Sequence, residues 1–169
     1  MSYKLIQKHR KSGVLIDTNL LLLLLIGTVD EDLISKFDRT RKRGFSSQDF
    51  RLLEKLIAFF ANNVVTTPNV LTEASNLSRK LYGAQREKYF ERFNACIQLF
   101  SEKYHPSKHC ADHPDFGRLG LTDISILRIA EKEILVLTDD FELARKLEAG
   151  KVDVLNFNNV RAIDWSPTI

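Results

Sequence analysis

The segment Val14-Leu15-Ile16-Asp17-Thr18-Asn19 sets the architecture of the chain, because it joins an apolar strand and a polar turn to the apolar run 20–26. Three consecutive aliphatic residues are typical of a strand that is covered on both faces. The leucines that follow are strong helix formers and lack the β-branched bias of a strand. The segment therefore predicts a buried strand, a turn that carries Asp17 and Asn19, and a buried helix.

Basic residues precede this apolar run, as they do in a signal peptide, but other features speak against secretion. Asp17 and Asn19 interrupt the run, and residues 27–30 offer no small-residue cleavage site. A membrane span needs about 20 apolar residues, far more than 20–26 provides. Two cysteines in 169 residues cannot build a disulfide framework. The sequence predicts a cytoplasmic protein that is not associated with a membrane.

Outward from this segment, short apolar runs alternate with helical spacing of apolar residues. Such alternation predicts an α/β fold, here a single-domain three-layer α/β/α structure with a mainly parallel sheet. Gly150 is placed to end the last helix in a left-handed conformation. The expected strands are 14–16, 64–67, 134–138 and 152–157, and the expected helices begin near Leu20, Ser46 or Ser47, Pro68, Thr122 and Phe141, with another around Tyr89.

No linker rich in Pro, Gly or Ser divides the chain, and its length suits one domain. We expect a basic N-terminal arm (1–13), a main domain (14–160) and a C-terminal tail (161–169). Between 101 and 120 the pattern gives way to His, Pro, Gly and Asp, which predicts a loop insertion.

Acidic residues recur where a predicted strand ends or a predicted helix starts. In open parallel sheets, ligands bind outside the carboxyl ends of the strands, so acidic residues far apart in the sequence can converge there. Helix capping accounts equally well for Asp123 or Asp140 taken singly. A charge at Asp17, between two apolar segments, would be costly without a partner. The acidic positions are Asp17, Glu73, Asp123, Asp139 and Asp140.

Converging carboxylates repel one another unless a cation neutralises them. Hard oxygen ligands without imidazole or thiolate select Mg²⁺ or Mn²⁺. Such an ion can activate water and stabilise the leaving oxygen in phosphodiester hydrolysis. The acidic positions therefore suggest metal-dependent hydrolysis without a His base or a Ser or Cys nucleophile.

Together, four motifs in this order resemble the PIN domain, over roughly residues 14–157. The resemblance implies a metal-dependent endoribonuclease, usually acting on single-stranded RNA, on a parallel sheet flanked by helices. The motifs are Asp17-Thr18-Asn19, Glu73 in the segment 67–73, Asp123 in the segment 121–126, and Leu137-Thr138-Asp139-Asp140-Phe141.

The resemblance assigns catalytic and metal-binding roles to the acidic residues. The fourth acid of the family usually stands two residues after the threonine, which is Asp140 here. Its neighbour Asp139 either assists as a metal ligand or is merely solvated. The catalytic and metal-binding residues implied are thus Asp17, Glu73, Asp123 and Asp140, and Asn19 and Thr138 would orient the ligands through hydrogen bonds.

Many small bacterial PIN proteins are toxins of VapBC-type toxin–antitoxin pairs, often dimeric and inhibited by a partner protein. The resemblance therefore implies an RNA substrate, and for a toxin also an antitoxin partner and a homodimer. This chain is longer than the members of that group, with the extra length between 95 and 120, a departure that speaks against the toxin role and leaves the nuclease role unaffected.

The net charge of +3 is too small to identify a polyanionic partner, but basic residues gather in 36–51. Cations beside an acidic metal centre would hold a nucleic-acid backbone while it is cut. Solvated helix faces and loops are the ordinary explanation of such charge runs. The candidate nucleic-acid contacts are Arg39, Arg41, Lys42 and Arg43.

A second cluster consists of His105, His109, Cys110 and His113, to which Cys96 could add a thiolate. The adjacent pair His109-Cys110 matches no familiar zinc-finger spacing, and nearby prolines suggest an exposed loop. An ordinary polar loop is therefore favoured over structural zinc. A third alternative is a loop that borders the substrate groove.

Two other functions compete with the nuclease. A non-catalytic PIN-like module could bind nucleic acid or protein without cutting, although no acidic position has been replaced. A haloacid-dehalogenase-like phosphatase needs a second Asp two residues after the first, where this chain has Asn19. Glycine-rich phosphate loops are absent, which disfavours nucleotide-dependent enzymes.

Overall fold

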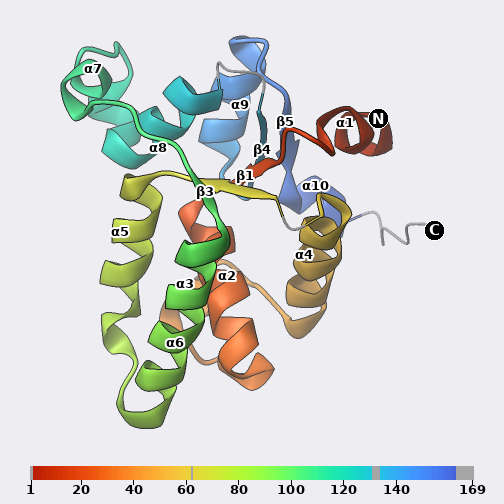
Figure 1. Cartoon of the computed structure of the whole chain (residues 1–169), viewed down its shortest axis with the longest axis vertical. Coiled ribbons are helices and arrows are strands. Elements are labelled where there is room, and N and C mark those ends of the chain that lie inside the picture. Colours follow the sequence, from red (N-terminus) through yellow and green to blue (C-terminus); the bar gives the residue numbers. More distant parts are fainter. Residues whose placement is uncertain (1, 62, 131–133, 163–169) are drawn as a thin grey trace.

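The computed structural model describes residues 2–61, 63–130 and 134–162, which form an α/β fold around a five-stranded sheet (Figure 1). Within these residues every strand pairing is parallel, and the strand order is β3-β2-β1-β4-β5. The predicted α/β class and parallel sheet are confirmed. The strands are β1 (Val14–Ile16), β2 (Val64–Thr66), β3 (Ser101–Glu102), β4 (Leu135–Thr138) and β5 (Val154–Asn156).

Helices lie on both sides of the sheet, an arrangement compatible with a three-layer α/β/α architecture. They are α1 (Ser2–His9), α2 (Thr18–Val29), α3 (Asp38–Lys42), α4 (Ser47–Phe59), α5 (Pro68–Leu77), α6 (Gly83–Leu99), α7 (Ser107–Ala111), α8 (Phe116–Ala130), α9 (Phe141–Ala149) and α10 (Phe157–Arg161), with 3₁₀ turns η1 (Glu31–Leu33) and η2 (Ser78–Lys80). Figure 1 shows α2, α4, α5 and α6 below the sheet, and α8 and α9 above it.

The segment that begins at Val14 folds as predicted. The side chains of β1 are fully buried between the layers. Helix α2 is buried almost all round, because α4, α5 and α6 surround it, which explains why leucines occupy more than one face of the helix. Although α2 is very apolar, no helix among the described residues is long and apolar enough to cross a membrane.

The strand order creates a topological switch beside β1. The chain passes from β1 to β2 and β3 on one side, then returns to β4 and β5 on the other. Because β1 and β4 pair in parallel, with Leu15 opposite Val136 and Ile16 opposite Leu137, their carboxyl ends meet at one edge. This edge is where open parallel sheets bind ligands.

Two local predictions are corrected by the structure. The segment 101–120 is not only a loop, since it contains β3, α7 and the start of α8. Gly150 ends α9 with a φ of −80°, and the left-handed residue is Lys151, with a φ of 57°. Beyond Lys151, the Val152 N–H donates a hydrogen bond to the Leu147 carbonyl at 2.9 Å, which closes the turn at the end of α9.

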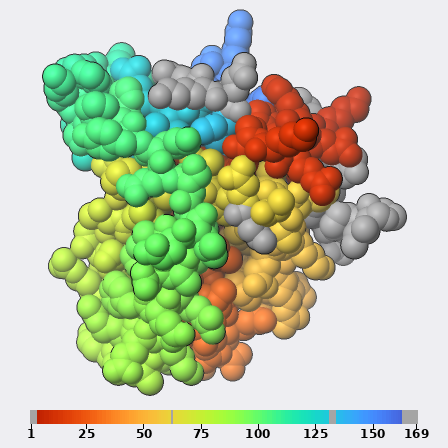
Figure 2. All heavy atoms as spheres, in the orientation of Figure 1, coloured from red at the N-terminus to blue at the C-terminus, as the bar shows by residue number. Residues whose placement is uncertain are grey.

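The segment predicted as a basic N-terminal arm, 1–13, contains the helix α1, which packs against the rest of the fold. The side chain of Ile6 in α1 is fully buried, and Figure 2 shows α1 against the body of the molecule. Lys8 Nζ and His9 Nε2 each lie 2.6 Å from Asp153 Oδ2 at the start of β5. Most of the predicted C-terminal tail, from residue 163, lies outside the described residues.

Candidate acidic site

Asp17 lies where β1 gives way to α2, at the carboxyl edge of the sheet. Its Oδ1 accepts a hydrogen bond from the Leu20 N–H at 2.8 Å and so caps α2. Its Oδ2 accepts one from the Thr138 hydroxyl and another, at 3.1 Å, from the Asp139 N–H. Burial and the nearby Asp139 carboxylate raise the pKa of Asp17 to about 8, although the Thr138 hydrogen bond lowers it.

Asp139 follows β4 and is also buried, with 4% of its surface exposed. Its Oδ1 accepts a hydrogen bond from Asn19 Nδ2 at 2.9 Å, and its Oδ2 lies 3.4 Å from Arg43 Nε. Its backbone carbonyl accepts a hydrogen bond from Asn158 Nδ2 at 2.7 Å. The alternative that Asp139 is merely solvated is therefore wrong.

The two carboxylate oxygens of Asp140 have different partners, the backbone of α9 for one and Arg43 for the other. Its Oδ1 caps α9 by accepting hydrogen bonds from the N–H groups of Glu142 and Leu143, at 2.8 and 3.1 Å. Its Oδ2 lies 3.6 Å from Arg43 Nη2. The expected orienting role of Thr138 has a structural basis, since its hydroxyl contacts Asp17 and also accepts a hydrogen bond from the Asp140 N–H at 2.9 Å.

Glu73 reaches the same edge from the second turn of α5. Its Oε2 accepts a hydrogen bond from the Thr18 hydroxyl at 3.0 Å. Because Thr18 directly follows Asp17, this bond ties α5 to the end of β1. Thr67 caps α5, and its hydroxyl lies 3.1 Å from that of Ser125 in α8. The contact of the Thr18 hydroxyl with Glu73 is not evident from the sequence pattern, because the two residues stand 55 positions apart.

Asp123 approaches from α8 and is half-buried. Burial raises its pKa to about 7, and the carboxylates of Asp140 and Glu73 add to the rise, whereas Arg43 lowers it. No hydrogen bond to the Asp123 carboxylate is found within the described part of the chain. Asp123 thus places an unpaired carboxylate close to two others.

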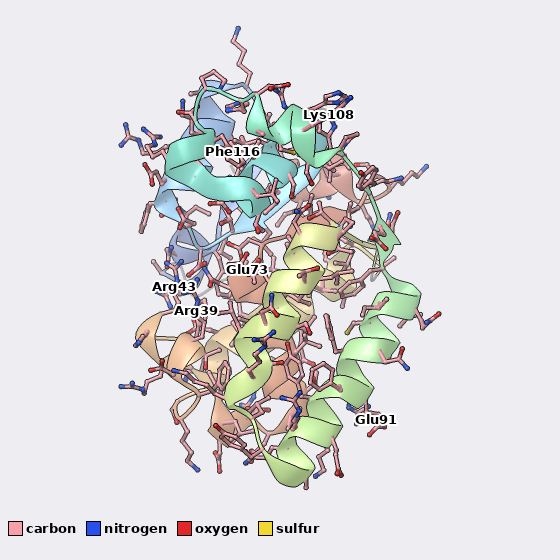
Figure 3. All side chains as sticks on the ribbon, turned by 90° about the vertical axis from the view of Figure 1, so that its left-hand side faces the viewer. Arg39, Arg43, Glu73, Glu91, Lys108 and Phe116 are labelled. Atoms are coloured by element: carbon pink, nitrogen blue, oxygen red, sulfur yellow. The ribbon has the colours of Figure 1, made fainter. Side chains whose placement is uncertain are left out.

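These contacts bring the predicted acidic residues into one group, which we call the acidic group. Asp17 and Asp139 are its buried members, and the charges of Asp140 and Glu73 raise the pKa of the half-buried Asp123. In Figure 3 the side chain of Arg43 lies beside that of Arg39, near Glu73. The members of the acidic group are Asp17, Glu73, Asp123, Asp139 and Asp140.

The acidic group fits a hard divalent cation in ligand chemistry. All its ligand atoms are carboxylate oxygens, which Mg²⁺ and Mn²⁺ prefer, and its like charges need a cation. Among the described residues, no three acidic, His or Cys side chains stand close enough together to hold one ion. Among the described residues, Arg43 forms ion pairs with two members of the acidic group, Asp139 and Asp140.

The four candidate nucleic-acid contacts all have partners inside the fold. Arg39 Nε donates a hydrogen bond to Asn19 Oδ1 at 2.9 Å. Arg41 and Lys42 pair with Asp38, at 2.9 and 3.1 Å. The spacing of Arg39 and Arg43 by four residues puts them on one helical face, which could have indicated that they share a target.

The His and Cys residues of the second cluster lie around α7, away from the acidic group. Cys110 is fully buried, and the rings of His105 and His109 lie 5.7 Å apart. His113 Nδ1 accepts a hydrogen bond from the Asp115 N–H at 3.1 Å. These contacts place the cluster in a folded part of the chain rather than an open loop.

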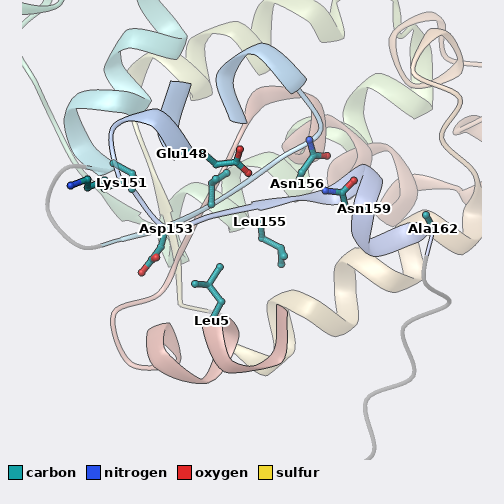
Figure 4. Close-up of a pocket in the computed structure, with 10 residues that line it drawn as sticks. Leu5, Glu148, Lys151, Asp153, Leu155, Asn156, Asn159 and Ala162 are labelled. Carbon is teal, nitrogen blue, oxygen red and sulfur yellow. The ribbon is translucent and has the colours of Figure 1, made fainter. Parts of the chain in front are cut away.

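A separate hollow lies along β5, between α1 and α10 (Figure 4). Apolar side chains of Leu5 and Leu155 line it together with the amides of Asn156 and Asn159. No member of the acidic group lines this hollow, so it is distinct from the acidic site.

Comparison with protein-family models, with curated proteins and with solved structures finds no match for this chain.

Proposed function

We propose that this protein is a divalent-metal-dependent endoribonuclease with a PIN-like fold, which hydrolyses phosphodiester bonds of single-stranded RNA. The observation that carries the proposal is the acidic group itself. Four separate parts of the chain bring carboxylates to the carboxyl edge of β1 and β4, where burial raises the pKa of Asp17 and of Asp123 and the neighbouring carboxylates raise both further. Such an arrangement costs stability unless it serves a cation.

The residues of the acidic group would have different roles. Asp17, Glu73, Asp123 and Asp140 would hold Mg²⁺ or Mn²⁺, and Asp139 would add a ligand or support its neighbours. A bound divalent ion supplies stabilisation of the negative charge that develops on a phosphodiester and activates water. Thr138 and Asn19 keep the buried carboxylates oriented through the hydrogen bonds that they donate to Asp17 and Asp139.

An exposed aromatic ring beside the acidic group supports a single-stranded substrate. Phe141 follows Asp140 directly and is 62% exposed. An exposed ring next to the reacting phosphate can stack on an unpaired base, whereas the bases of a duplex already stack on one another.

The alternative is a PIN-like module that binds nucleic acid or protein without cutting it. One observation favours it: Arg43 already supplies a positive charge to Asp139 and Asp140. A toxin role, with an antitoxin partner and a homodimer, remains a prediction from the sequence resemblance alone.

A cleavage assay separates the two functions. The purified protein would be incubated with end-labelled single-stranded RNA and matched DNA in Mg²⁺, Mn²⁺ or EDTA. We expect RNA cleavage with either metal, none in EDTA, and a loss of about 100-fold or more in Asp123→Asn, because even partners of metal ligands contribute 10- to 100-fold. The control is Glu91→Gln, an exposed carboxylate of α6 that lies far from the site (Figure 3).

Cleavage that persists in EDTA, or that Asp123→Asn leaves unchanged, would contradict the nuclease. RNA binding without cleavage under all three conditions would instead support the binding module.

A further inference from the structure

Arg43 occupies the place among the carboxylates where a cation is needed. It ends α3, and its guanidinium lies between Asp139 Oδ2, at 3.4 Å, and Asp140 Oδ2, at 3.6 Å. These distances exceed the 2.7–2.9 Å of a charge-assisted hydrogen bond. Arg43 is therefore held mainly by attraction between charges and not by fixed hydrogen bonds.

Arg39 in the short helix α3 and Arg43, which directly follows that helix, both lie toward the acidic group. One turn before Arg43, Arg39 donates to Asn19, which in turn donates to Asp139 Oδ1. Asp139 Oδ2 thus pairs directly with the Arg43 guanidinium, and Asp139 Oδ1 is linked to the Arg39 guanidinium through the Asn19 amide. The contact with Asn19 is a hydrogen bond of 2.9 Å, so Arg39 is the more firmly held of the two arginines.

The rest of α3 is fixed independently of the acidic group. The Thr40 hydroxyl donates to the Ile34 carbonyl at 2.6 Å, and Lys80 Nζ lies 2.9 Å from Asp38 Oδ2. Arg43 itself sits at the last position before Gly44, which has a φ of 66°, and 32% of its side chain is exposed. The side chain can therefore leave the carboxylates while the helix stays in place.

We propose that Arg43 is an exchangeable counter-ion, which neutralises Asp139 and Asp140 in the metal-free protein and is displaced when a divalent cation binds the acidic group. The proposal rests on the metal site of the proposed function. A guanidinium and a divalent cation cannot share the space between two carboxylates, because they repel each other strongly at such short range. Arg43 thus weakens metal binding and acts as a positioning residue for the carboxylates.

The test is a calorimetric titration of the full-length, metal-free protein with Mn²⁺. We expect Arg43→Ala to bind Mn²⁺ about 5- to 10-fold more tightly than the wild type, because the ion no longer competes with a partly exposed ion pair. Arg43→Lys should restore an affinity close to that of the wild type. The matched control is Arg51→Ala, which removes an exposed arginine paired with Glu31 at 2.9 Å, away from the site.

A second measurement distinguishes counter-ion exchange from a loss of folding. In EDTA, Arg43→Ala should melt at a lower temperature than the wild type, and saturating Mn²⁺ should remove this difference. A purely structural role would leave the difference in place when the metal is bound.

Each outcome has a separate meaning. Equal or weaker Mn²⁺ binding by Arg43→Ala, with binding by the wild type intact, would overturn the exchange but not the metal site. If neither protein binds Mn²⁺, the metal site of the proposed function fails, and Arg43 is a permanent counter-ion. Binding by Arg43→Ala alone would overturn the exchange, because Arg43 would then exclude the ion from the wild type instead of being displaced by it.

Discussion

Thr138 shows how one hydroxyl holds two carboxylate residues of the acidic group. It is fully buried, donates to Asp17 Oδ2 and accepts from the Asp140 N–H. Thr138→Val keeps the shape of the side chain but leaves a buried carboxylate and a backbone amide without this partner. We expect the free energy of unfolding to fall by about 1–3 kcal/mol in urea denaturation.

Thr66 in β2 provides the matched control for this substitution. It is 1% exposed, and its hydroxyl has no hydrogen-bond partner among the residues that the structure describes. Thr66→Val should leave the free energy of unfolding unchanged or raise it, because a methyl group replaces an unsatisfied hydroxyl. Equal losses in the two variants would show that the Thr138 hydrogen bonds contribute nothing.

Asp123 gives the metal-free protein a characteristic dependence on pH. Because its pKa of about 7 lies above the value of about 4 in an unfolded chain, the folded state keeps a proton that the unfolded state loses. The resulting stabilisation is complete below about pH 4 and is lost as the pH rises through 7. In EDTA, the free energy of unfolding of the wild type should therefore fall between pH 5 and pH 7.

Asp123→Asn cannot ionise and should lose less stability over the same range, by up to about 2 kcal/mol, since one carboxyl contributes about 1.4 kcal/mol per pH unit. Urea denaturation at several pH values measures the difference. Asp17 keeps part of the slope in both proteins, because its pKa is also raised. If the free energies of unfolding of the wild type and of Asp123→Asn changed equally with pH, Asp123 would ionise as freely in the folded protein as in the unfolded chain.

At the residue scale, the sequence predicts where the acidic residues lie in the fold better than it predicts which side chains contact them. Asp17, Asp139 and Asp140 can be placed because each follows an apolar strand, and strands of a parallel sheet end at a common edge. Their partners cannot be derived in this way. The contact of Arg43 with Asp139 depends on where a five-residue helix settles, which no local pattern determines.

At the scale of elements, α2 and α4 approach each other at Gly27. A Cβ atom at this position would lie 2.3 Å from Cδ2 of the buried Phe50 ring. In an exposed helix, Gly→Ala stabilises by about 1 kcal/mol. Here we expect Gly27→Ala to destabilise the protein by about 1–3 kcal/mol, because the ring must shift within a packed core. Thermal and urea unfolding measure the change.

Gly117 in α8 is the control for this prediction, because a Cβ there would meet no atom within 4 Å. Gly117→Ala should be neutral or stabilising. Phe50→Leu in the Gly27→Ala background should recover part of the loss, since it frees the space that the new methyl group needs. If Gly27→Ala were as stable as Gly117→Ala, the two helices would pack less closely than the structure shows.

The elements that the sequence predicts are those with a local apolar pattern. Of this kind are the strands β1, β2, β4 and β5 and the helices α2, α4, α5, α6, α8 from Thr122 onward, and α9. β3 has only the polar residues Ser101 and Glu102, and it becomes a strand through pairing with β2. Helix α1 has few apolar residues, and its packing depends on Ile6 and on the ion pairs of Asp153 with Lys8 and His9.

At the scale of the whole molecule, the strand order decides which carboxylates meet. The alternation of strands and helices predicts a parallel sheet, but it does not determine that β4 lies beside β1 rather than at an edge. This order depends on packing between distant segments, such as the contacts of β4 with α2, α8 and α9. It brings Asp139 to Asp17 across 122 residues of sequence.

The distribution of charge over the molecule also depends on the fold. The net charge of +3 conceals an acidic group at one edge of the sheet, with Arg39 of α3 and the following Arg43 turned toward it. A divalent cation in this group would both neutralise it and free Arg43. The protein with metal bound would then present more positive charge to a nucleic acid than the metal-free protein does.

The central claim is that the acidic group binds a divalent cation, and calorimetric titration with Mn²⁺ of the wild type and of Asp123→Asn tests it most directly. We predict saturable binding by the wild type, at least about 10-fold weaker binding by Asp123→Asn, and unchanged binding by Glu91→Gln. No binding by the wild type, or equal binding by the wild type and Asp123→Asn, would contradict the claim.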